Sequence, residues 1–344
     1  MIRLAVLGLG ERGRQRLQTL TALPEVAVEM VYDRDETARR WVKARYPEIE
    51  VVADLHRVLS DLSIHAVVVA LPAAEQSPLA CQALASGKHC LVEWPPAVSL
   101  EGLREIQAFS RERKRVAVIS LPLLFHPAAA RIKELIERGD LGRVFYVSAI
   151  HHRPASFLVD QHVTWSLAYG EVSLALFLLG ETPRRVRATG FYFLNHRADT
   201  VSLHLEFLSG RHALVEVSGL GAEPVRSFSV VGSKRSARLD LLSAQAPLAL
   251  HTPLREGETE ALGSNPWALE TRWLSLQAVP PLQEETRHFL ECIGQGRAPL
   301  ADLGRVEDLL RVLLAADLSL RYDGAHVDVA RQSVQIPMGW RAAA

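Results

Sequence analysis

The stretch Gly8-Leu9-Gly10-Glu11-Arg12-Gly13 directly follows an apolar run, Ile2–Leu7, and precedes residues 14–23, whose leucines share one face of a helix. In this strand–turn–helix setting a Gly-x-Gly-x-x-Gly pattern binds a dinucleotide. The first glycine permits the tight turn, the second lets the backbone approach a pyrophosphate, and the third lets helix and strand pack closely. The helix N-terminus then presents N–H groups to the phosphates. The stretch therefore predicts a dinucleotide site, and the alternative is a glycine-rich turn that binds nothing.

An acidic residue stands where the ribose of a dinucleotide is expected. A second apolar segment, residues 26–31, ends at Tyr32-Asp33, and Asp33 lies 20 positions past Gly13. A carboxylate there accepts hydrogen bonds from the ribose hydroxyls and repels the 2′-phosphate of NADP. Arg34 follows at once and is able to pair with that phosphate. The sequence thus favours NAD as the cofactor and leaves NADP as the alternative.

The first third of the chain alternates strands and helices. After residue 33, helices are expected at residues 36–45, 55–60, 76–86 and 100–113, and strands at residues 51–52, 64–71, 89–92 and 116–120. Repeated βα units predict a doubly wound parallel sheet with right-handed connections. Such sheets bind ligands beyond the carboxyl ends of their strands. Leu71-Pro72 and Glu93-Trp94 end two of the strands, so we expect both pairs to line the cofactor crevice.

The rest of the chain has a different pattern. Strands with period two are expected at residues 144–150, 186–193, 201–207, 213–217, 227–231 and 237–241, and helices at residues 125–138, 171–179, 281–293 and 303–320. Successive alternating strands predict an antiparallel sheet with one covered face. Residues 244–279, rich in proline, glycine and glutamate, predict a long excursion.

A chain of 344 residues is too long for one ordinary core, so two domains are expected. We predict an α/β protein. Residues 1–121 form a Rossmann domain with a doubly wound parallel sheet that binds NAD(P). Residues 122–344 form a C-terminal α+β domain with a large, mostly antiparallel open sheet, for substrate binding and oligomerisation.

Composition argues against several classes of protein. The 39 basic and 39 acidic residues balance, which removes the electrostatic footprint of a nucleic-acid binder. No apolar stretch approaches the roughly 20 residues of a membrane helix. The three cysteines lack metal-ligand spacing, so neither a metal site nor a disulfide framework is expected. The first apolar segment is a strand rather than a signal peptide, so we expect a cytoplasmic protein.

Several motifs occur in the order found in one oxidoreductase family. Besides the glycine loop and Asp33, they are Glu93-Trp94-Pro95, Gly139-Asp140-Leu141-Gly142-Arg143-Val144, Val231-Gly232-Ser233-Lys234-Arg235 and His288-Phe289-Leu290-Glu291-Cys292-Ile293. On these motifs the chain resembles the Gfo/Idh/MocA family (glucose–fructose oxidoreductase, inositol dehydrogenase, MocA) over nearly its full length. The resemblance implies NAD or NADP and a sugar, nucleotide-sugar or polyol as substrate. It also implies a homodimer or homotetramer formed through the C-terminal sheet.

The chain departs from the family at the residues that transfer protons. Family members normally carry Glu-Lys-Pro where this chain has Glu93-Trp94-Pro95, and a tryptophan has no cation. Sugar-dehydrogenase relatives carry Trp-Asp-Leu-Ala-Pro-His-Asp where this chain has Trp165-Ser166-Leu167-Ala168-Tyr169-Gly170-Glu171. Gly170 therefore stands at the catalytic histidine, and Ser166 at the first aspartate. Oxidation of a hydroxyl needs a base within hydrogen-bond reach, and Gly170 offers none.

Two residues are candidates to replace the lost base. His162 precedes the helix, Tyr169 adjoins the vacated position, and either side chain can act as an acid or a base. The alternative interpretations are an exposed loop histidine and a packed aromatic ring with its hydroxyl at the surface.

Other residues are expected to line a substrate pocket, namely Trp94, His126, His152, Trp165 and Gly170. Trp94 is placed to stack on the nicotinamide or to close the pocket, and a rigid turn before two prolines is the alternative. Neighbouring strand residues face opposite ways, so at most one residue of His151-His152 points into the crevice. We assign His152 to that role, with a solvated strand end as the alternative. For His126 the alternative is a helix entry.

Two classes of function remain open. The first is an NAD(P)-dependent oxidoreductase that acts on a sugar-like substrate with an altered proton-transfer group. The second is a catalytically inactive family member that binds a dinucleotide or a sugar and acts as a sensor or partner subunit. A fold retained only for assembly is a third, weaker interpretation.

Overall fold

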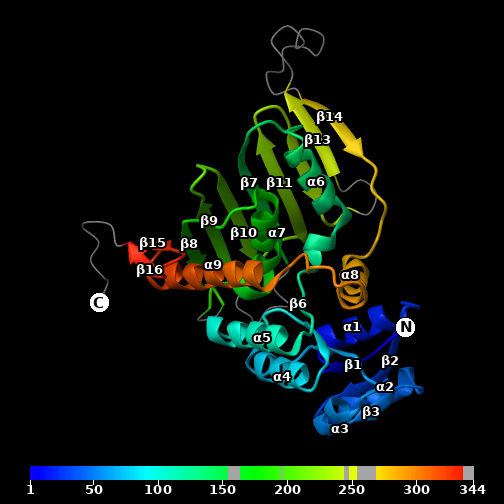
Figure 1. Ribbon diagram of the computed structural model, residues 1–344. Helices are drawn as coiled ribbons and strands as arrows, with labels where there is room; N and C mark the ends of the chain where they lie inside the picture. Colours follow the sequence, from blue (N-terminus) through cyan, green and yellow to red (C-terminus); the bar gives the residue numbers. More distant parts are fainter. Residues whose placement is uncertain (154–162, 195–196, 244–247, 254–268, 336–344) are drawn as a thin grey trace. The chain divides into compact units, whose positions relative to one another are not determined.

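The computed structural model divides the chain into two compact units (Figure 1). The first comprises Met1–Phe125 and Pro280–Glu307, and the second comprises His126–Val279 and Asp308–Ala344. The structure describes residues 1–153, 163–194, 197–243, 248–253 and 269–335.

The first unit is built on a six-stranded parallel sheet with the order β3-β2-β1-β4-β5-β6. Its strands are β1 (Ile2–Leu7), β2 (Val26–Tyr32), β3 (Glu50–Val52), β4 (Ala66–Val69), β5 (His89–Val92) and β6 (Ala117–Ile119). Its helices are α1 (Glu11–Thr21), α2 (Glu36–Arg45), α3 (Leu55–Ser60), α4 (Ala73–Ala85), α5 (Leu100–Arg113) and α8 (Pro281–Gln295), with a 3-10 turn at Pro122–Phe125. The strand order reverses between β1 and β4, which is where doubly wound sheets bind ligands. The predicted Rossmann architecture is confirmed.

Side-chain caps set where three helices of this unit begin. Asp35, Asp54 and Ser99 each accept a hydrogen bond from a backbone N–H two or three residues further on. Such caps satisfy N–H groups that have no partner within the helix. The helix α1 is different, because it begins at Glu11 after an extended Gly10 and has no side-chain cap. It therefore starts three residues earlier than its leucine spacing predicts, and the glycine loop is itself the helix N-terminus.

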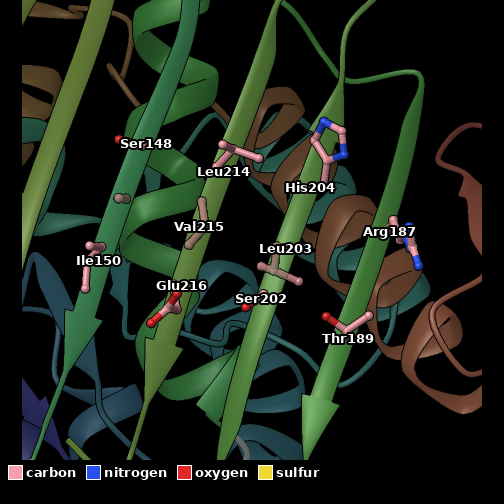
Figure 2. Close-up of a pocket in the computed structure, with 11 residues that line it drawn as sticks. Ser148, Ile150, Arg187, Thr189, Ser202, Leu203, His204, Leu214, Val215 and Glu216 are labelled. Carbon is pink, nitrogen blue, oxygen red and sulfur yellow. The ribbon is translucent and has the colours of Figure 1, made fainter.

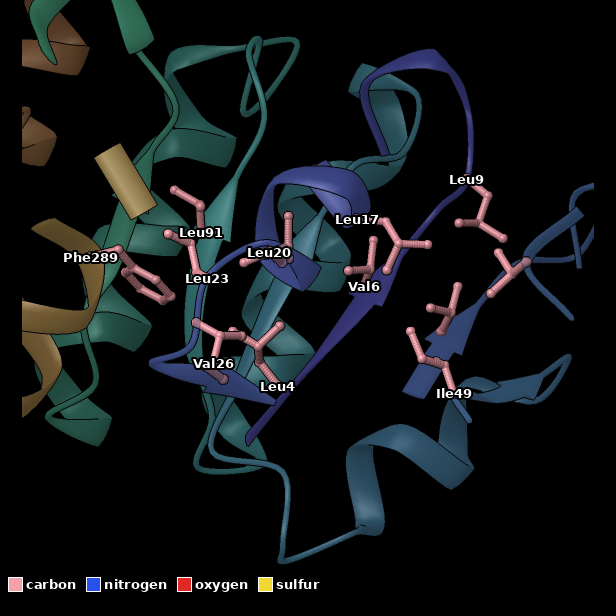
Figure 3. Close-up of a cluster of buried hydrophobic side chains, with 14 of the residues drawn as sticks. Leu4, Val6, Leu9, Leu17, Leu20, Leu23, Val26, Ile49, Leu91 and Phe289 are labelled. Atoms are coloured by element: carbon pink, nitrogen blue, oxygen red, sulfur yellow. The ribbon is translucent and has the colours of Figure 1, made fainter. Parts of the chain in front are cut away.

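A hydrophobic cluster joins β1, α1 and α8 (Figure 3). Leu4 and Val6 of β1 and Leu17 and Leu20 of α1 are fully buried, and so is Phe289 of α8. Complete burial of such a side chain stabilises a fold by about 1.5–3 kcal/mol. This packing places α8 in the first unit, although its sequence follows the strands of the second and lies within the predicted domain 122–344.

The second unit is built on a ten-stranded sheet with the order β14-β13-β12-β11-β7-β10-β9-β8-β15-β16. Its strands are β7 (Val144–His152), β8 (Arg185–Phe191), β9 (Thr200–Glu206), β10 (His212–Ser218), β11 (Val225–Gly232), β12 (Ser236–Asp240), β13 (Leu248–Pro253), β14 (Leu269–Leu274), β15 (His326–Asp328) and β16 (Ser333–Gln335). Its helices are α6 (Pro127–Glu137), α7 (Tyr169–Leu179) and most of α9 (Leu303–Arg321), and a π-helical turn, Thr164–Ala168, precedes α7. Strands β7 and β10 pair in parallel, and the other described pairs of this sheet are antiparallel.

One face of this sheet is covered and the other is open. Helices α6, α7 and α9 lie on the covered face (Figure 1). Along β9, Val201, Leu203 and Leu205 are buried while the residues between them are partly exposed. On the open face, Phe145 and Leu214 are each 45% exposed. The predicted open, mostly antiparallel sheet is confirmed.

The sheet extends further than the sequence pattern predicts. Strands β13 and β14 pair within residues 244–279, where an excursion is expected. Leu248, Ala249 and Leu250 are all buried, so β13 begins with consecutive rather than alternating apolar residues and lacks the period-two signal. Strands β15 and β16 have three residues each, which is too short for any periodicity. Residues 244–247 and 254–268 lie outside the described part.

Candidate functional site

Two glycines allow the close packing of the β1–α1 loop. Gly8 has a φ of +97°, and a Cβ there would lie 2.4 Å from the carbonyl oxygen of Ala70. A Cβ on Gly13 would lie 2.0 Å from the carbonyl oxygen of Gly8. Both neighbours are backbone atoms of the sheet and its loop, so a larger residue at either position would push helix and strand apart.

Gly10, by contrast, borders open space. A Cβ on Gly10 would meet no atom within 4 Å, and no side chain caps the helix that begins at the exposed Glu11. The N–H groups of the first turn therefore point to a region where an anion can approach, at the positive end of the helix dipole. The loop fits a pyrophosphate.

Asp33 holds the end of β2 against this loop. Its Oδ2 accepts a hydrogen bond from the N–H of Leu9 at 2.6 Å, and its Oδ1 accepts from the N–H of Asp35 at 2.8 Å. Each carboxylate oxygen retains a second lone pair that is able to accept from a ribose hydroxyl. The neighbouring Arg34 forms an ion pair with Glu75 at 2.9 Å. The carboxylate, rather than Arg34, therefore contacts the glycine loop, which is the arrangement that suits NAD.

The loops after β4 and β5 meet at the same edge of the sheet. Arg12 donates through Nη1 to the carbonyl oxygen of Trp94 at 2.5 Å and lies 3.9 Å from Glu93. Leu71 packs beside the first glycine, and Pro72 is the N-cap of α4. The side chain of Trp94 is buried. The structure thus brings the predicted cofactor residues of four loops to the carboxyl edge of the parallel sheet.

A buried arginine connects α1 to the residue before Trp94. Arg16 is 1% exposed and forms ion pairs with Glu93 and with Glu285 of α8. Burial by itself lowers the pKa of Arg16, but the two carboxylates outweigh it and raise that pKa well above its ordinary value. Burial raises the pKa of Glu285, although Arg16 opposes this. Nothing in the sequence marks this cluster, because its members lie 77 and 269 positions apart.

In the second unit, a π-helical turn, Thr164–Ala168, leads into the start of α7, where Tyr169 and Gly170 lie. Trp165 donates its indole N–H to Asp317 of α9 at 2.7 Å. Tyr169 is the first residue of α7 and is half-buried, and Gly170 after it is buried. Turns of this π type often mark functional sites. His162 lies outside the described residues.

Glu171 anchors a charged cluster behind Gly170. Its Oε1 lies 2.8 Å from Nε of Arg226 on β11 and 3.1 Å from Nδ1 of His151 on β7. Arg226 and His151 are direct partners in the antiparallel β7–β11 ladder. Nothing in the sequence marks Arg226 as functional, because only the strand register places it opposite His151.

Both members of the Glu171–Arg226 pair are charged. Burial raises the pKa of Glu171, but Arg226 and then His151 outweigh it and hold that pKa below its ordinary value. Burial likewise lowers the pKa of Arg226, and Glu171, with a smaller contribution from Tyr169, raises it above its ordinary value. The phenol of Tyr169 therefore lies within electrostatic range of the Arg226 guanidinium.

The two predicted pocket histidines of this unit lie in different places. His126 caps α6, where its Nδ1 accepts from the N–H of Ala128 at 3.1 Å. Burial, and to a smaller extent Arg226, lowers the pKa of His126. His152 instead pairs with Glu216 at 2.8 Å, on the face of β7 opposite His151. Of the adjacent pair, His151 is the residue that contacts α7.

The open face of the sheet carries a shallow groove of about 490 Å³ (Figure 2). The residues labelled there are Ser148, Ile150, Arg187, Thr189, Ser202, Leu203, His204, Leu214, Val215 and Glu216. Glu216, the partner of His152, belongs to this groove. Near it, Nε2 of His204 lies 2.9 Å from Nδ1 of His212. His152 therefore belongs to the open face rather than to the surroundings of Gly170.

Three further properties of the described residues bear on function. No group of three or more His, Cys, Asp or Glu side chains among them is arranged to hold a metal ion. None of the helices in the described ranges has the length and apolar character needed to cross a membrane. The three cysteines are buried and free, and burial raises the pKa of Cys81 to about 11.

Comparison with known families decides the assignment. Residues 2–120 match the model of an oxidoreductase family with an NAD-binding Rossmann fold, and residues 129–238 match the GFO/IDH/MocA C-terminal domain. The chain belongs to the Gfo/Idh/MocA oxidoreductase family. Its first unit is accordingly an NAD-binding Rossmann domain, and the prediction of NAD is confirmed.

Individual family members are similar over most of their length. The chain is 25% identical over 339 residues to scyllo-inositol 2-dehydrogenase (NAD(+)) of Bacillus subtilis (strain 168). The matched region covers 93% of this chain and 94% of that protein. It is 26% identical over 251 residues to UDP-N-acetylglucosamine 3-dehydrogenase of Acidithiobacillus ferrooxidans, which covers 70% of this chain and 75% of that protein.

Solved structures show the same fold. For UDP-N-acetylglucosamine 3-dehydrogenase GnnA from Acidithiobacillus ferrooxidans, the TM-score is 0.82 at 22% identity, over 94% of this chain and 98% of that chain. For GenD2 from gentamicin A biosynthesis in complex with NAD, it is 0.77 at 24% identity, over 95% and 96% of the two chains.

Proposed function

We propose that this family member oxidises or reduces a sugar, nucleotide-sugar or polyol with NAD, using a proton-transfer group that differs from the family's lysine and histidine. The observation that carries the proposal is the complete cofactor loop, with the Asp33 carboxylate hydrogen-bonded to Leu9. NAD accepts or donates the hydride. The residues of this chain bind and orient the substrate and transfer the proton.

The proposed cofactor contacts follow from the geometry of the loops. The first turn of α1 holds the pyrophosphate through N–H groups, and Asp33 accepts from the adenosine ribose. The full proposed set is Gly8, Gly10, Glu11, Arg12, Gly13, Asp33, Arg34, Leu71, Pro72, Glu93 and Trp94.

The proposed substrate class rests on two relatives whose names specify an inositol and a UDP-sugar. For the acid–base role we propose Tyr169 or His162. Support for Tyr169 comes from its place beside Gly170 and from Arg226, because a nearby cation stabilises a phenolate. We keep Trp94, His126, His152, Trp165 and Gly170 as proposed pocket positions, with His152 the least supported because it pairs with Glu216.

The cofactor test is a titration with NADH and with NADPH, followed by energy transfer from tryptophan to the reduced nicotinamide. Micromolar binding of NADH with weaker binding of NADPH is expected. Asp33→Asn should weaken NADH binding and reduce the preference for NADH over NADPH. Asp54→Asn is the matched control, because Asp54 caps α3 and asparagine caps helices equally well. Binding of neither cofactor would contradict the proposal.

The turnover test uses a panel of inositols, sugars and nucleotide-sugars with NAD. Tyr169→Phe should lower kcat by about 100-fold or more, the contribution of a general acid or base. Tyr322→Phe is the control, because Tyr322 directly follows α9 and is 39% exposed. An unchanged kcat in Tyr169→Phe would leave His162 as the proposed group.

A binding protein without turnover is the second candidate function. It is favoured by one observation, the buried Gly170 in place of a basic side chain. NADH binding without oxidation of any compound in the panel would support it. The double variant Trp94→Lys, Gly170→His then distinguishes the two, because new sugar dehydrogenase activity would indicate a site from which only these groups are missing.

We also propose that the open sheet face joins copies of this chain into a homodimer or homotetramer. Phe145, Tyr146, Ile150 and Leu214 expose apolar surface there, and contiguous apolar patches often mark interfaces. Leu214→Glu should lower the mass measured by light scattering, whereas Leu62→Glu, in an exposed turn of the first unit, should not. A monomeric wild-type protein would contradict this proposal.

The cytoplasm is the proposed compartment. It is supported by three buried cysteines that are free, as is usual for proteins of a reducing environment. A fractionation that found the protein outside the cytoplasm would contradict this proposal.

A further inference from the structure

The ion pair between Arg226 and Glu171 uses only one edge of the guanidinium. A guanidinium carries five N–H donors in a planar fork and can bind acceptors along more than one edge. Glu171 accepts from Nε at 2.8 Å. No acceptor among the described residues bonds the terminal nitrogens Nη1 and Nη2, and the side chain is 31% exposed. Within the described part of the chain, the terminal edge of Arg226 is therefore open to a ligand.

The carboxylate that holds Arg226 is shielded from solvent. Glu171 is 0% exposed, and its Oε2 has no hydrogen-bond partner among the described residues. Because separation of the pair would leave a buried charge uncompensated, Glu171 keeps the guanidinium in one position. A ligand that binds the open edge then meets a side chain whose freedom is already restricted, which favours affinity.

One neighbour of Arg226 offers a further N–H donor. His126 uses Nδ1 to accept from Ala128, so in its neutral form the proton is on Nε2, which is a donor. Arg226 contributes to the low pKa of His126, so the two side chains lie within electrostatic range. His151 contacts the same Glu171 oxygen and is 12% exposed. A positive charge with an additional N–H donor, and with its carboxylate fully buried, is the chemistry that binds an oxyanion.

We propose that Arg226 binds an oxyanion of the substrate, and that the substrate is therefore an acidic sugar or polyol. A carboxylate matches the two parallel N–H groups of the terminal guanidinium edge, and a phosphate ester offers the same match. This inference rests on the proposed function, because it names the substrate class for the same part of the second unit. It concerns binding, so it does not require that the protein turns the ligand over.

The experiment is isothermal titration of the full chain with D-glucuronate, D-glucose 6-phosphate and D-glucose, each with and without saturating NADH. Wild-type protein should bind glucuronate at least about tenfold more tightly than glucose, a difference of about 1.4 kcal/mol. Stronger binding of the phosphate ester than of glucuronate would also support the proposal and would identify phosphate as the oxyanion. Equal binding of all three, or no binding of either anion, would overturn it.

Three variants assign the preference to Arg226. Arg226→Gln should abolish the preference for the anion, whereas Arg226→Lys should retain part of it, because lysine keeps the charge but not the bidentate fork. Glu171→Gln should reduce the preference without contacting the ligand. Arg211→Gln is the matched control, because Arg211 pairs with Glu181 at 2.7 Å in the same unit and is 24% exposed. Retention of the anion preference by Arg226→Gln would overturn the proposal.

The same measurements separate this inference from the proposed function. Anion binding that depends on Arg226, without oxidation of any compound, would leave the inference standing while the proposed function fails. NAD-dependent oxidation of neutral sugars by wild type and by Arg226→Gln at equal rates would do the reverse. Thermal melting of each variant shows that the fold is retained.

Discussion

Each unit contains a buried glutamate paired with an arginine, and the two clusters differ in how far the arginine is enclosed. In the first unit, Arg16 is 1% exposed and pairs with both Glu93 and Glu285. In the second, Arg226 is 31% exposed and pairs with Glu171 through Nε. One guanidinium is surrounded by protein, and the other keeps an edge toward solvent.

This difference shows how similar ion pairs serve different purposes. Arg16 connects α1, the loop after β5 and α8, so its ionic contacts are intramolecular and hold the Rossmann unit together. Arg226 connects β11 to α7 and still has donors to offer. Enclosure therefore favours a structural role, and partial exposure favours recognition.

The largest expected effect concerns the first cluster, in which Arg16 is enclosed by protein and pairs with Glu93 and Glu285. Arg16→Met removes the cation and leaves Glu93 and Glu285 buried without their partner, which should lower the free energy of unfolding by about 3–5 kcal/mol. Urea denaturation measures this loss. Arg57→Met is the control, because Arg57 is 50% exposed beside Glu50 and should contribute less than about 1 kcal/mol. Equal losses of unfolding free energy in the two variants would contradict a structural role for the enclosed Arg16.

The second test concerns the rigid glycine loop of the first unit. A methyl group in Gly13→Ala would lie 2.0 Å from the carbonyl oxygen of Gly8, so α1 must move and NADH binding should weaken by about 100-fold, or about 2.7 kcal/mol. Gly294→Ala is matched to it, because a Cβ there meets nothing within 4 Å. Fluorescence titration with NADH measures both. Comparable affinities in the two variants would show that the loop tolerates displacement.

The third test measures how much the second cluster, in which Arg226 is partly exposed, contributes to the free energy of unfolding. Arg226→Met leaves Glu171 with His151 as its remaining partner, so the free energy of unfolding should fall by about 1–3 kcal/mol, less than for Arg16→Met. Urea denaturation of both variants side by side decides the order. A loss as large as that of Arg16→Met would assign Arg226 a structural role and weaken the distinction.

The smallest expected effect is a difference in pH dependence between the two carboxylates. The folded pKa of Glu171 lies below its ordinary value of 4.5, so the stabilisation it provides is present above pH 4.5 and is lost as the pH falls through the folded pKa. The folded pKa of Glu285 lies above 4.5, so its contribution is greatest below pH 4.5 and declines as the pH rises through the folded pKa.

Unfolding of the Glu171→Gln and Glu285→Gln variants across this range measures both contributions. The stability difference between wild type and Glu171→Gln should shrink toward acid pH. The difference between wild type and Glu285→Gln should shrink toward neutral pH. Two stability differences that change with pH in the same direction would contradict the assigned pKa directions.

The arrangement of the proposed cofactor loops could be predicted from the sequence because its determinants are local or follow from strand order. The glycine loop is six consecutive residues, and Asp33 follows at a fixed spacing. Leu71 and Glu93 end strands whose carboxyl ends must meet at one edge of a parallel sheet. The caps Asp35, Asp54 and Ser99 are local in the same way, since each acts within three residues of itself.

The second unit was less predictable because its contacts depend on register. The glycine at position 170 is visible in the sequence, but the position of Arg226 beside Glu171 is not. Adjacent histidines on β7 were recognised as facing opposite ways, yet which of them meets α7 depends on how the sheet packs. The structure places His151 on Glu171 and His152 on Glu216.

The sequence by itself determined the Rossmann topology, NAD as the cofactor and the family, because these follow from short spacings and alternating periodicity. Only the tertiary structure decided that α8 packs in the first unit and that Arg16 and Arg226 find buried carboxylates. Those pairings join residues 55 to 269 positions apart. A charged residue in a sequence carries no sign of its partner, and burial, which gives such a pair its strength, exists only once the chain has folded.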